Sequence, residues 1–240
     1  MAVAILVAGF GSISFAQNLD ESKWGKNTPG VELATHEGPR ERTSSGTVLI
    51  YNILGKGFPA DKKYDLWFWK LGQSPQNAIQ GASFDKHGLL VCSGKPGFCK
   101  GAVADDAVNI KATATLGEPK RFAVISADGT VAGFADAVPF PLEASDKGCR
   151  LSVVREAADA AVVAVRVRGF APNEPLIVKT NIRLPDSAHN PVSSSDGTWQ
   201  ATMQTKSAGQ SSGIANIQVS GKACLVGLSF NWGEGSAKQQ

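Results

Sequence analysis

Apolar and polar residues alternate along this chain in short runs, and dipeptides rich in Gly, Asp and Pro separate the runs. Successive side chains of a strand point to opposite faces, so such runs predict strands with one buried face. No stretch shows a sustained helical period. The first half contains predicted strands at residues 47–54, 64–71, 88–92, 108–116, 121–126 and 131–135. The second half contains predicted strands at residues 150–155, 161–168, 175–182, 198–205, 214–220 and 224–232.

The turns between these runs favour an all-β fold. Asp128-Gly129 separates two adjacent runs, which is a strong hairpin signal, and Asp196-Gly197 marks a turn in the second half. Regularly spaced short strands of this kind are typical of β-sandwiches. The length of 240 residues favours two such domains over one.

The predicted organisation follows from changes in composition. Residues 17–45 are polar and lack periodicity, which indicates a flexible arm. Residues 138–142 (VPFPL) contain two prolines, which cannot donate to a β-ladder, and so indicate a stiff linker. The predicted parts are a signal peptide at 1–16, a flexible arm at 17–45, a β-sandwich at 46–138, a Pro-rich linker at 139–145 and a second β-sandwich at 146–235.

An internal repeat indicates that the two domains are similar. Residues 57–66 (GFPADKKYDL) align with residues 169–178 (GFAPNEPLIV), and each copy lies between two predicted strands. A glycine turn follows each copy, at Gly88 and at Gly197. With this Gly-Phe-x-Pro-like turn the chain resembles the bacterial secreted immunoglobulin-like domains. The resemblance implies two immunoglobulin-like β-sandwiches in tandem, and it implies no single function because this architecture hosts many.

The first residues predict export. Residues 2–15 form an uncharged apolar run that ends in small residues around Ala16, and polar sequence starts at Gln17. This is the pattern of a signal peptide, although no Lys or Arg precedes the run, and the run is too short to cross a bilayer as a helix. No later apolar stretch is long enough to span a membrane. We therefore expect a secreted or periplasmic protein with no membrane span in the mature chain.

Four cysteines in an exported chain predict two disulfides, for which three pairings are possible. Cys92 and Cys99 flank a short loop rich in Gly and Pro, which favours a local bridge between them. That bridge would leave Cys149 to pair with Cys224 across most of the second half. A four-cysteine zinc site is the competing interpretation, but the paired C-x-x-C spacing that it needs is missing.

Composition and charge narrow the range of partners. Hydrophobic residues make up 42% and charged residues 19% of the chain, as in a packed globular protein. The net charge of +3 comes from Lys and Arg scattered along the sequence without a basic block. Nucleic acid is therefore not an expected partner.

Two segments imitate catalytic motifs. Residues 209–213 (GQSSG) match the G-x-S-x-G nucleophile elbow, which needs a preceding strand, a following helix and a downstream base. These residues lie between predicted strands, and His36, His87 and His189 all precede them. Residues 55–60 (GKGFPA) imitate a dinucleotide-binding turn, but they lead into a strand and not into a helix. We therefore expect no enzyme and no cofactor.

No metal site is expected from the sequence. The histidines stand in three different neighbourhoods, and no pair of them has ligand spacing. Carboxylates that could be proposed for calcium are Asp105, Asp106, Asp128 and Asp136, but they lack the dense alternation of oxygen ligands that a calcium loop needs.

The segment of greatest functional interest is residues 64–70 (YDLWFWK), which contains two tryptophans on one face of a predicted strand. The internal repeat aligns Tyr64 and Leu66 with apolar residues of the second copy, so these two side chains are expected in the core. Trp67 and Trp69 then point away from the core. Such a pair is either covered by other parts of the chain, which is the commoner case, or available for binding.

The leading hypothesis from the sequence is a non-enzymatic exported binding or structural module that acts through sheet faces or edges. Its partner would be another protein, a polymer of the cell envelope or further copies of the same chain. The alternative is a carbohydrate-binding protein that uses Trp67 and Trp69. A hydrolase or metalloenzyme assembled from loops ranks third, because histidines are few and have no ligand spacing.

Overall fold

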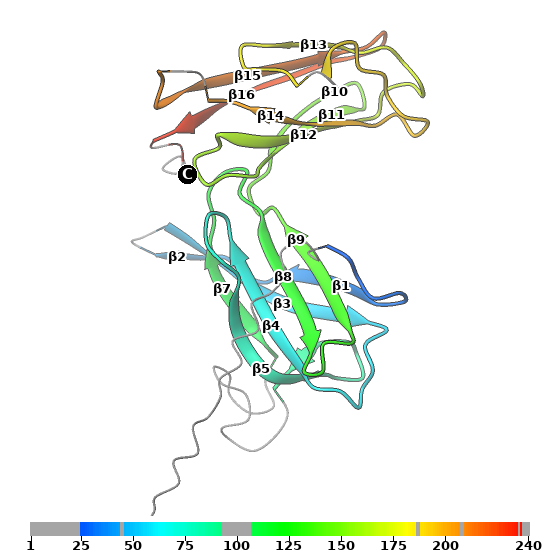
Figure 1. Cartoon of the computed structure of the whole chain (residues 1–240), viewed down its shortest axis with the longest axis vertical. Coiled ribbons are helices and arrows are strands. Elements are labelled where there is room, and N and C mark those ends of the chain that lie inside the picture. The colour runs from blue at the N-terminus through cyan, green and yellow to red at the C-terminus, as the bar shows by residue number, and fades with distance from the viewer. Residues whose placement is uncertain are drawn as a thin grey trace, which may run out of the picture.

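The computed structural model describes residues 25–43, 46–92, 107–185, 188–206, 209–234 and 236. These residues form sixteen strands, every strand pairing is antiparallel, and none of the described residues forms an α-helix. No helix that could span a membrane is therefore found in this part of the chain. The all-β class is confirmed, and the strands gather in two lobes, which Figure 1 shows one above the other.

The N-terminal lobe, residues 25–140, contains two antiparallel sheets (Figure 1). In one sheet β3 pairs with β1, β2 and β7, and the other sheet has the order β6-β5-β4-β8-β9. Its strands are β1 (Glu32–Glu37), β2 (Glu41–Thr43), β3 (Gly46–Lys56), β4 (Tyr64–Lys70), β5 (Gln76–Phe84), β6 (Leu90–Val91), β7 (Asn109–Thr113), β8 (Lys120–Ser126) and β9 (Ala132–Ala137).

The C-terminal lobe, residues 142–236, contains a sheet of four strands and a sheet of three. The orders are β10-β11-β12-β14 and β13-β15-β16. Its strands are β10 (Leu142–Asp146), β11 (Cys149–Arg155), β12 (Val162–Arg168), β13 (Ile177–Thr180), β14 (Trp199–Gln204), β15 (Ser212–Ser220) and β16 (Leu225–Gly233).

Each lobe has its own hydrophobic cluster, to which both of its sheets contribute buried side chains. In the N-terminal lobe the rings of Tyr51 on β3 and Phe122 on β8 lie 5.3 Å apart and join the two sheets. In the C-terminal lobe Val153 on β11 and Ile217 on β15 belong to the same cluster. The alternation of apolar residues that predicted the strands thus supplies the inward face of each sheet.

The prediction of a flexible arm over residues 17–45 is wrong for residues 25–43. Residues 32–37 pair with β3 in continuous register as β1, and the apolar side chains of Val31 and Leu33 lie in the N-terminal core. Only these two apolar positions are buried in the segment, so its alternation was too short to be distinguished from loop sequence. The predicted signal peptide and the remainder of the arm lie outside the described residues.

Besides β1 and β2, which lie in the predicted arm, the strands β5 and β10 were not predicted. β5 is irregular, since its pairing with β4 shifts register between Tyr64 and Trp67, and such irregularity interrupts the alternation of side chains. β10 occupies most of the predicted linker at 139–145 and pairs with β11. Pro139 and Pro141 precede β10, where they interrupt no ladder hydrogen bond.

The two copies of the Gly-Phe turn have the same backbone requirement. Gly57 and Gly169 have positive φ angles of 77° and 86°. A Cβ atom at Gly57 would lie 2.0 Å from the carbonyl oxygen of Gly30, and one at Gly169 would lie 2.3 Å from that of Gly148. Only glycine fits both the conformation and the close approach of the neighbouring turn.

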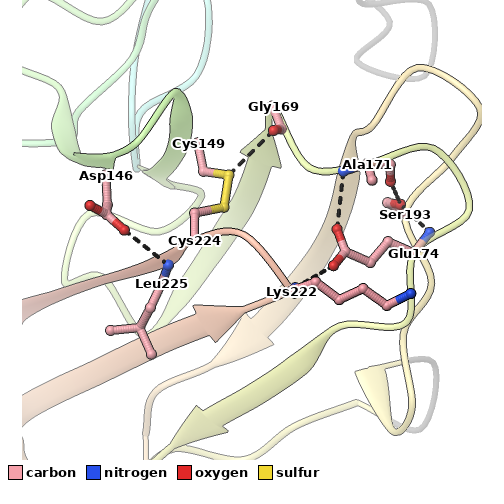
Figure 2. The surroundings of a disulfide bond; sticks show 9 residues. All are labelled: Asp146, Cys149, Gly169, Ala171, Glu174, Ser193, Lys222, Cys224 and Leu225. Carbon is pink, nitrogen blue, oxygen red and sulfur yellow. Dashed lines mark hydrogen bonds between the residues drawn. A yellow bond between two sulfur atoms is a disulfide. The ribbon is translucent and has the colours of Figure 1, made fainter.

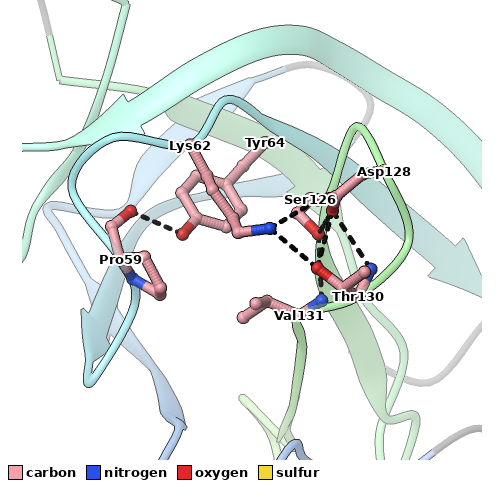
Figure 3. Close-up of polar contacts among 7 residues, drawn as sticks. All are labelled: Pro59, Lys62, Tyr64, Ser126, Asp128, Thr130 and Val131. Carbon is pink, nitrogen blue, oxygen red and sulfur yellow. Dashed lines mark hydrogen bonds and ion pairs between the residues drawn. The ribbon is translucent and has the colours of Figure 1, made fainter.

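A second pair of similar turns has the sequence S-x-D-G-T, at residues 126–130 and 194–198. In each turn the aspartate accepts hydrogen bonds from the Ser hydroxyl and from both the amide and the hydroxyl of the Thr. In the first turn Lys62 also bonds to Asp128 (Figure 3). The pKa of the Asp128 carboxyl lies below its ordinary value, mainly because of the Lys62 ammonium group and secondly because of the hydroxyl donors of Ser126 and Thr130. Figure 3 also shows the Tyr64 hydroxyl donating to the Pro59 carbonyl, at 2.7 Å.

The predicted disulfide between Cys149 and Cys224 is present (Figure 2). Cys149 is the first residue of β11 and Cys224 directly precedes β16, so the bond joins the two sheets of the C-terminal lobe. Cys92 is also disulfide-bonded, and Cys99, its expected partner, lies outside the described residues.

Glu174 connects two loops next to this disulfide (Figure 2). Its carboxylate accepts hydrogen bonds from the backbone N–H of Lys222, in the β15–β16 hairpin, and from that of Ala171 at 3.0 Å. The hydrogen bond from the Lys222 amide lowers the pKa of the Glu174 carboxyl. Burial opposes this effect, and the hydrogen bond from the Ala171 amide adds to it. The charged form therefore fits the folded state better than the unfolded one.

Replacing Glu174 with glutamine is expected to lower the melting temperature at pH 7, because a side-chain amide presents only one acceptor oxygen to two N–H donors. The wild-type carboxylate stabilises the fold fully above its ordinary pKa and loses that contribution as the pH falls through the lower, folded value. The difference between the two proteins should therefore shrink at pH 3. Thermal melts at both pH values test this, and an equal difference at pH 3 and pH 7 would contradict it.

The two lobes are joined by a backbone hydrogen bond at Gly117, whose carbonyl accepts from the N–H of Arg155 at 2.8 Å. The N–H of Gly117 donates to the carbonyl of Phe140, at the end of the N-terminal lobe, at 2.7 Å. The neighbouring Leu116 packs against the hydrophobic cluster of the C-terminal lobe. One side-chain ion pair also crosses the junction, from Arg121 Nη2 to Glu156 Oε2 at 2.8 Å.

Beside this junction the N-terminal lobe buries an ion pair. The side chain of Lys120 is 1% exposed and pairs with Glu118, whose side chain is 14% exposed. Glu118 Oε2 also accepts hydrogen bonds from the amide and the hydroxyl of Thr115, both at 2.9 Å. Burial lowers the pKa of the Lys120 ammonium, and the bond to Glu118 opposes this effect.

Candidate binding face

The tryptophans singled out in the sequence lie on β4. Along this strand Tyr64, Leu66 and Phe68 are buried in the N-terminal core, whereas Trp67 and Trp69 are half-buried on the opposite face. That face is the outer one of the sheet β6-β5-β4-β8-β9.

Trp67 belongs to a row of three residues on neighbouring strands. It lies opposite Ala123 on β8, and Ala123 lies opposite Phe134 on β9. Directly opposed residues share a face of the sheet, so all three side chains point outward. Ala123, between two residues with large rings, is 0% exposed. We call these three residues the outer aromatic row.

Trp69 has a different environment from Trp67. The guanidinium of Arg121 lies 4.9 Å from the centre of the Trp69 ring, in a cation–π contact, and the same guanidinium pairs with Glu156 across the junction. Arg121 Nε also lies 3.9 Å from Asp136 Oδ2. Trp69 is thus a residue of the junction, and Trp67 is the better candidate for contact with a ligand.

Two polar side chains lie beside Trp67. Asn77 on β5 is paired with Trp67, and its amide nitrogen donates to Asp65 Oδ2 at 3.5 Å. Asp65 Oδ1 accepts from the backbone N–H of Gly81 at 3.1 Å, which orients the carboxylate. An aromatic ring with a few oriented polar groups beside it is the usual composition of a small-ligand site.

A second candidate is a hollow of about 740 Å³ over the sheet β13-β15-β16. Its outward side chains are mostly polar and alternate with buried ones along each strand. Lys179, Asn181, Asn216, Gln218 and Ser229 line it, and Gly227 provides the open space between them. The amides of Asn181 and Asn216 and the hydroxyl of Ser229 are already hydrogen-bonded to one another or to the backbone, which makes this surface the weaker candidate.

In the described chain, a strand and not a helix follows each of the two segments that imitate catalytic motifs. In residues 209–213, Ser212 already begins β15, so a strand follows the serines. His36, His87 and His189 are exposed at separate places in the described chain. Residues 55–60 are the end of β3 and the turn at Gly57, and β4 follows.

The acidic residues considered for calcium are separate. Asp128 is bonded within its own turn and to Lys62, and Asp136 lies near Arg121. Asp105 and Asp106 lie outside the described residues. Among the residues that the structure describes, no group of three or more His, Cys, Asp or Glu side chains could hold a metal ion.

No protein-family model matches this sequence, and the comparison with curated proteins gives no match either.

Proposed function

We propose that this chain is a non-enzymatic, exported binding or structural module that acts by contact through a sheet face. The outer aromatic row carries the proposal. Trp67 and Phe134 place two large rings on the outside of a sheet, where they add nothing to the core of their own lobe. Tryptophan is enriched at the centres of protein contacts. The partner would be a protein, a component of the cell envelope or a second copy of the chain.

The architecture that we propose for this module is two immunoglobulin-like sandwiches in tandem. Sheets of four and three strands joined by a disulfide support it for the C-terminal lobe. The similar glycine turns at Gly57 and Gly169 support the relation between the lobes. The disulfide also supports export, since such bonds persist in oxidising compartments.

Carbohydrate binding is the second candidate, and Asp65 and Asn77 favour it. Sugar rings stack on aromatic side chains through their apolar faces, while their hydroxyl groups need donors and acceptors close by. Trp67 with these two side chains offers both. Trp69, held under Arg121, contributes less than the sequence suggested.

The double variant Trp67→Ser/Phe134→Ser tests whether the outer aromatic row binds a partner. Binding to isolated envelope fragments, to neutral polysaccharides and to the protein itself is measured by co-sedimentation, tryptophan fluorescence and sedimentation velocity. Wild-type protein is expected to bind at least one of these probes, and the variant should bind it roughly tenfold more weakly, as for the loss of central aromatic contacts.

The matched control for this test is Trp232→Phe, which changes a buried tryptophan of the C-terminal core and leaves the outer face intact. A response to neutral polysaccharide alone would select the carbohydrate function. A response to none of the probes, or equal binding by wild type and double variant, would overturn the proposal.

A further inference from the structure

Three arginines meet on the outer face of the four-stranded sheet of the C-terminal lobe. Arg150 on β11 lies directly opposite Arg168 on β12. Arg166, two residues before Arg168, lies on the same face and opposite Ser152. All three guanidinium groups therefore project from adjacent strands on one side of the sheet.

The charge of this cluster is only partly compensated. Arg150 Nη1 bonds to Glu143 Oε2 at 3.2 Å. Arg166 and Arg168 are exposed, and they form no ion pair with any residue that the structure describes. Like charges directly opposite one another destabilise a sheet. The arrangement therefore opposes folding by a small amount, and the two guanidinium groups without an ion-pair partner among the described residues are available to an anion.

The arginines surround a hollow of about 370 Å³, which is within the range of small-ligand sites. We call it the arginine hollow. Between the cations it offers neutral hydrogen-bonding side chains. Its lining residues include the three arginines, Ser152, Thr198, Gln200 and Glu143, whose carboxylate is already paired with Arg150.

We propose that the arginine hollow binds the carboxylate or sulfate groups of an acidic polysaccharide. Guanidinium forks match the geometry of such oxyanions and hold them with paired hydrogen bonds. The hydroxyl group of Ser152 and the amide of Gln200 suit the hydroxyl groups that flank each acidic group of a sugar chain, whereas the Thr198 hydroxyl already donates to Asp196. The inference rests on the proposed contact function but concerns a different lobe and face from Trp67.

Other polyanions fit the hollow less well. Proteins bind duplex nucleic acid through many phosphate contacts along an extended basic surface. The cluster described here consists of three arginines, and the chain carries a net charge of only +3. Binding to an anionic membrane usually adds apolar side chains that insert beside the cations. Of the large apolar side chains that are exposed in the described chain, none lines the arginine hollow.

The test compares the full chain with Arg166→Gln/Arg168→Gln in binding to dextran sulfate, polygalacturonate and uncharged dextran. Wild type should bind at least one acidic polymer and not dextran, and the variant should lose roughly tenfold or more in affinity, as for two charge-assisted contacts. The matched control, Lys206→Gln/Lys222→Gln, removes the same charge from exposed positions outside the hollow.

Several results would overturn the inference. They are an equal loss of affinity in variant and control, no binding of either acidic polymer, or tighter binding to polyglutamate, duplex DNA or anionic lipid vesicles. The Trp67→Ser/Phe134→Ser variant, measured with the same polymers, separates the two proposals. Unchanged binding of dextran sulfate by that variant supports an independent hollow, whatever the outcome for the aromatic face.

Discussion

Replacement of Cys149 and Cys224 together by alanine is expected to lower the free energy of unfolding of the C-terminal lobe by about 4 kcal/mol. The two cysteines are 75 residues apart, so their bond removes a large loop-closure entropy from the unfolded chain. A loss of this size is a large part of the roughly 5–15 kcal/mol that stabilises an ordinary domain. The loss should be concentrated in this lobe, because the bond joins its two sheets.

Urea unfolding of the oxidised proteins measures the difference, and hydrogen exchange locates it. The amides of β11, β12 and β16 should exchange faster in the variant, while those of β4 and β8 serve as an internal control in the other lobe. A change below about 1 kcal/mol would show that the disulfide constrains the unfolded chain far less than loop entropy predicts.

A second large loss of stability is expected when the buried ion pair between Lys120 and Glu118 is broken. Lys120→Met leaves the carboxylate of Glu118 without its cation, and breaking a buried pair from one side costs about 3 to 5 kcal/mol. The hydrogen bonds from Thr115 keep that carboxylate in place, so it cannot turn out to solvent without losing them.

The control for Lys120→Met is Lys111→Met, which breaks the pair between Lys111 and Glu41. The side chains of this pair are 61% and 48% exposed, so the expected loss is below about 1 kcal/mol. Urea unfolding of both variants gives the comparison. Similar losses in the two variants would contradict the role assigned to burial.

Part of the candidate face could have been predicted from the sequence. Asp128-Gly129 forms the centre of the β8–β9 hairpin, and residues equidistant from such a turn are paired. Ala123 and Phe134 are equidistant from it, so their pairing could be derived from the turn alone. The pairing of Trp67 with Ala123 could not, because β4 and β8 are far apart in the chain and no local turn sets their register.

The difference between local signals and long-range strand pairing also explains which other features could be predicted from the sequence. The Cys149–Cys224 bond could be predicted because the short loop between the other two cysteines left one pairing. β1 was missed because its evidence is mostly backbone pairing with β3, which side-chain alternation does not report. In the arginine hollow, Arg166 and Arg168 share a face by alternation alone. Arg150 joins them through a register set across the loop at residues 156–161, which has no simple turn signal.

The junction at Gly117 determines which substitutions can change the angle between the lobes. Its inter-lobe bond, from the N–H of Arg155 to the carbonyl of Gly117, is made by main-chain atoms, so it does not depend on the identity of neighbouring side chains. Surface residues that make no contact across the junction can therefore diverge during evolution while this bond is kept, whereas Arg121, Glu156 and Leu116 contribute side-chain contacts to the junction. A substitution of Gly117 itself would strain the backbone, because its φ is +74°, and would displace the Leu142 side chain, whose Cδ1 would lie 2.7 Å from the new Cβ atom. In distant relatives a glycine at this position would therefore indicate the same junction between the lobes, even where the rest of the sequence has changed.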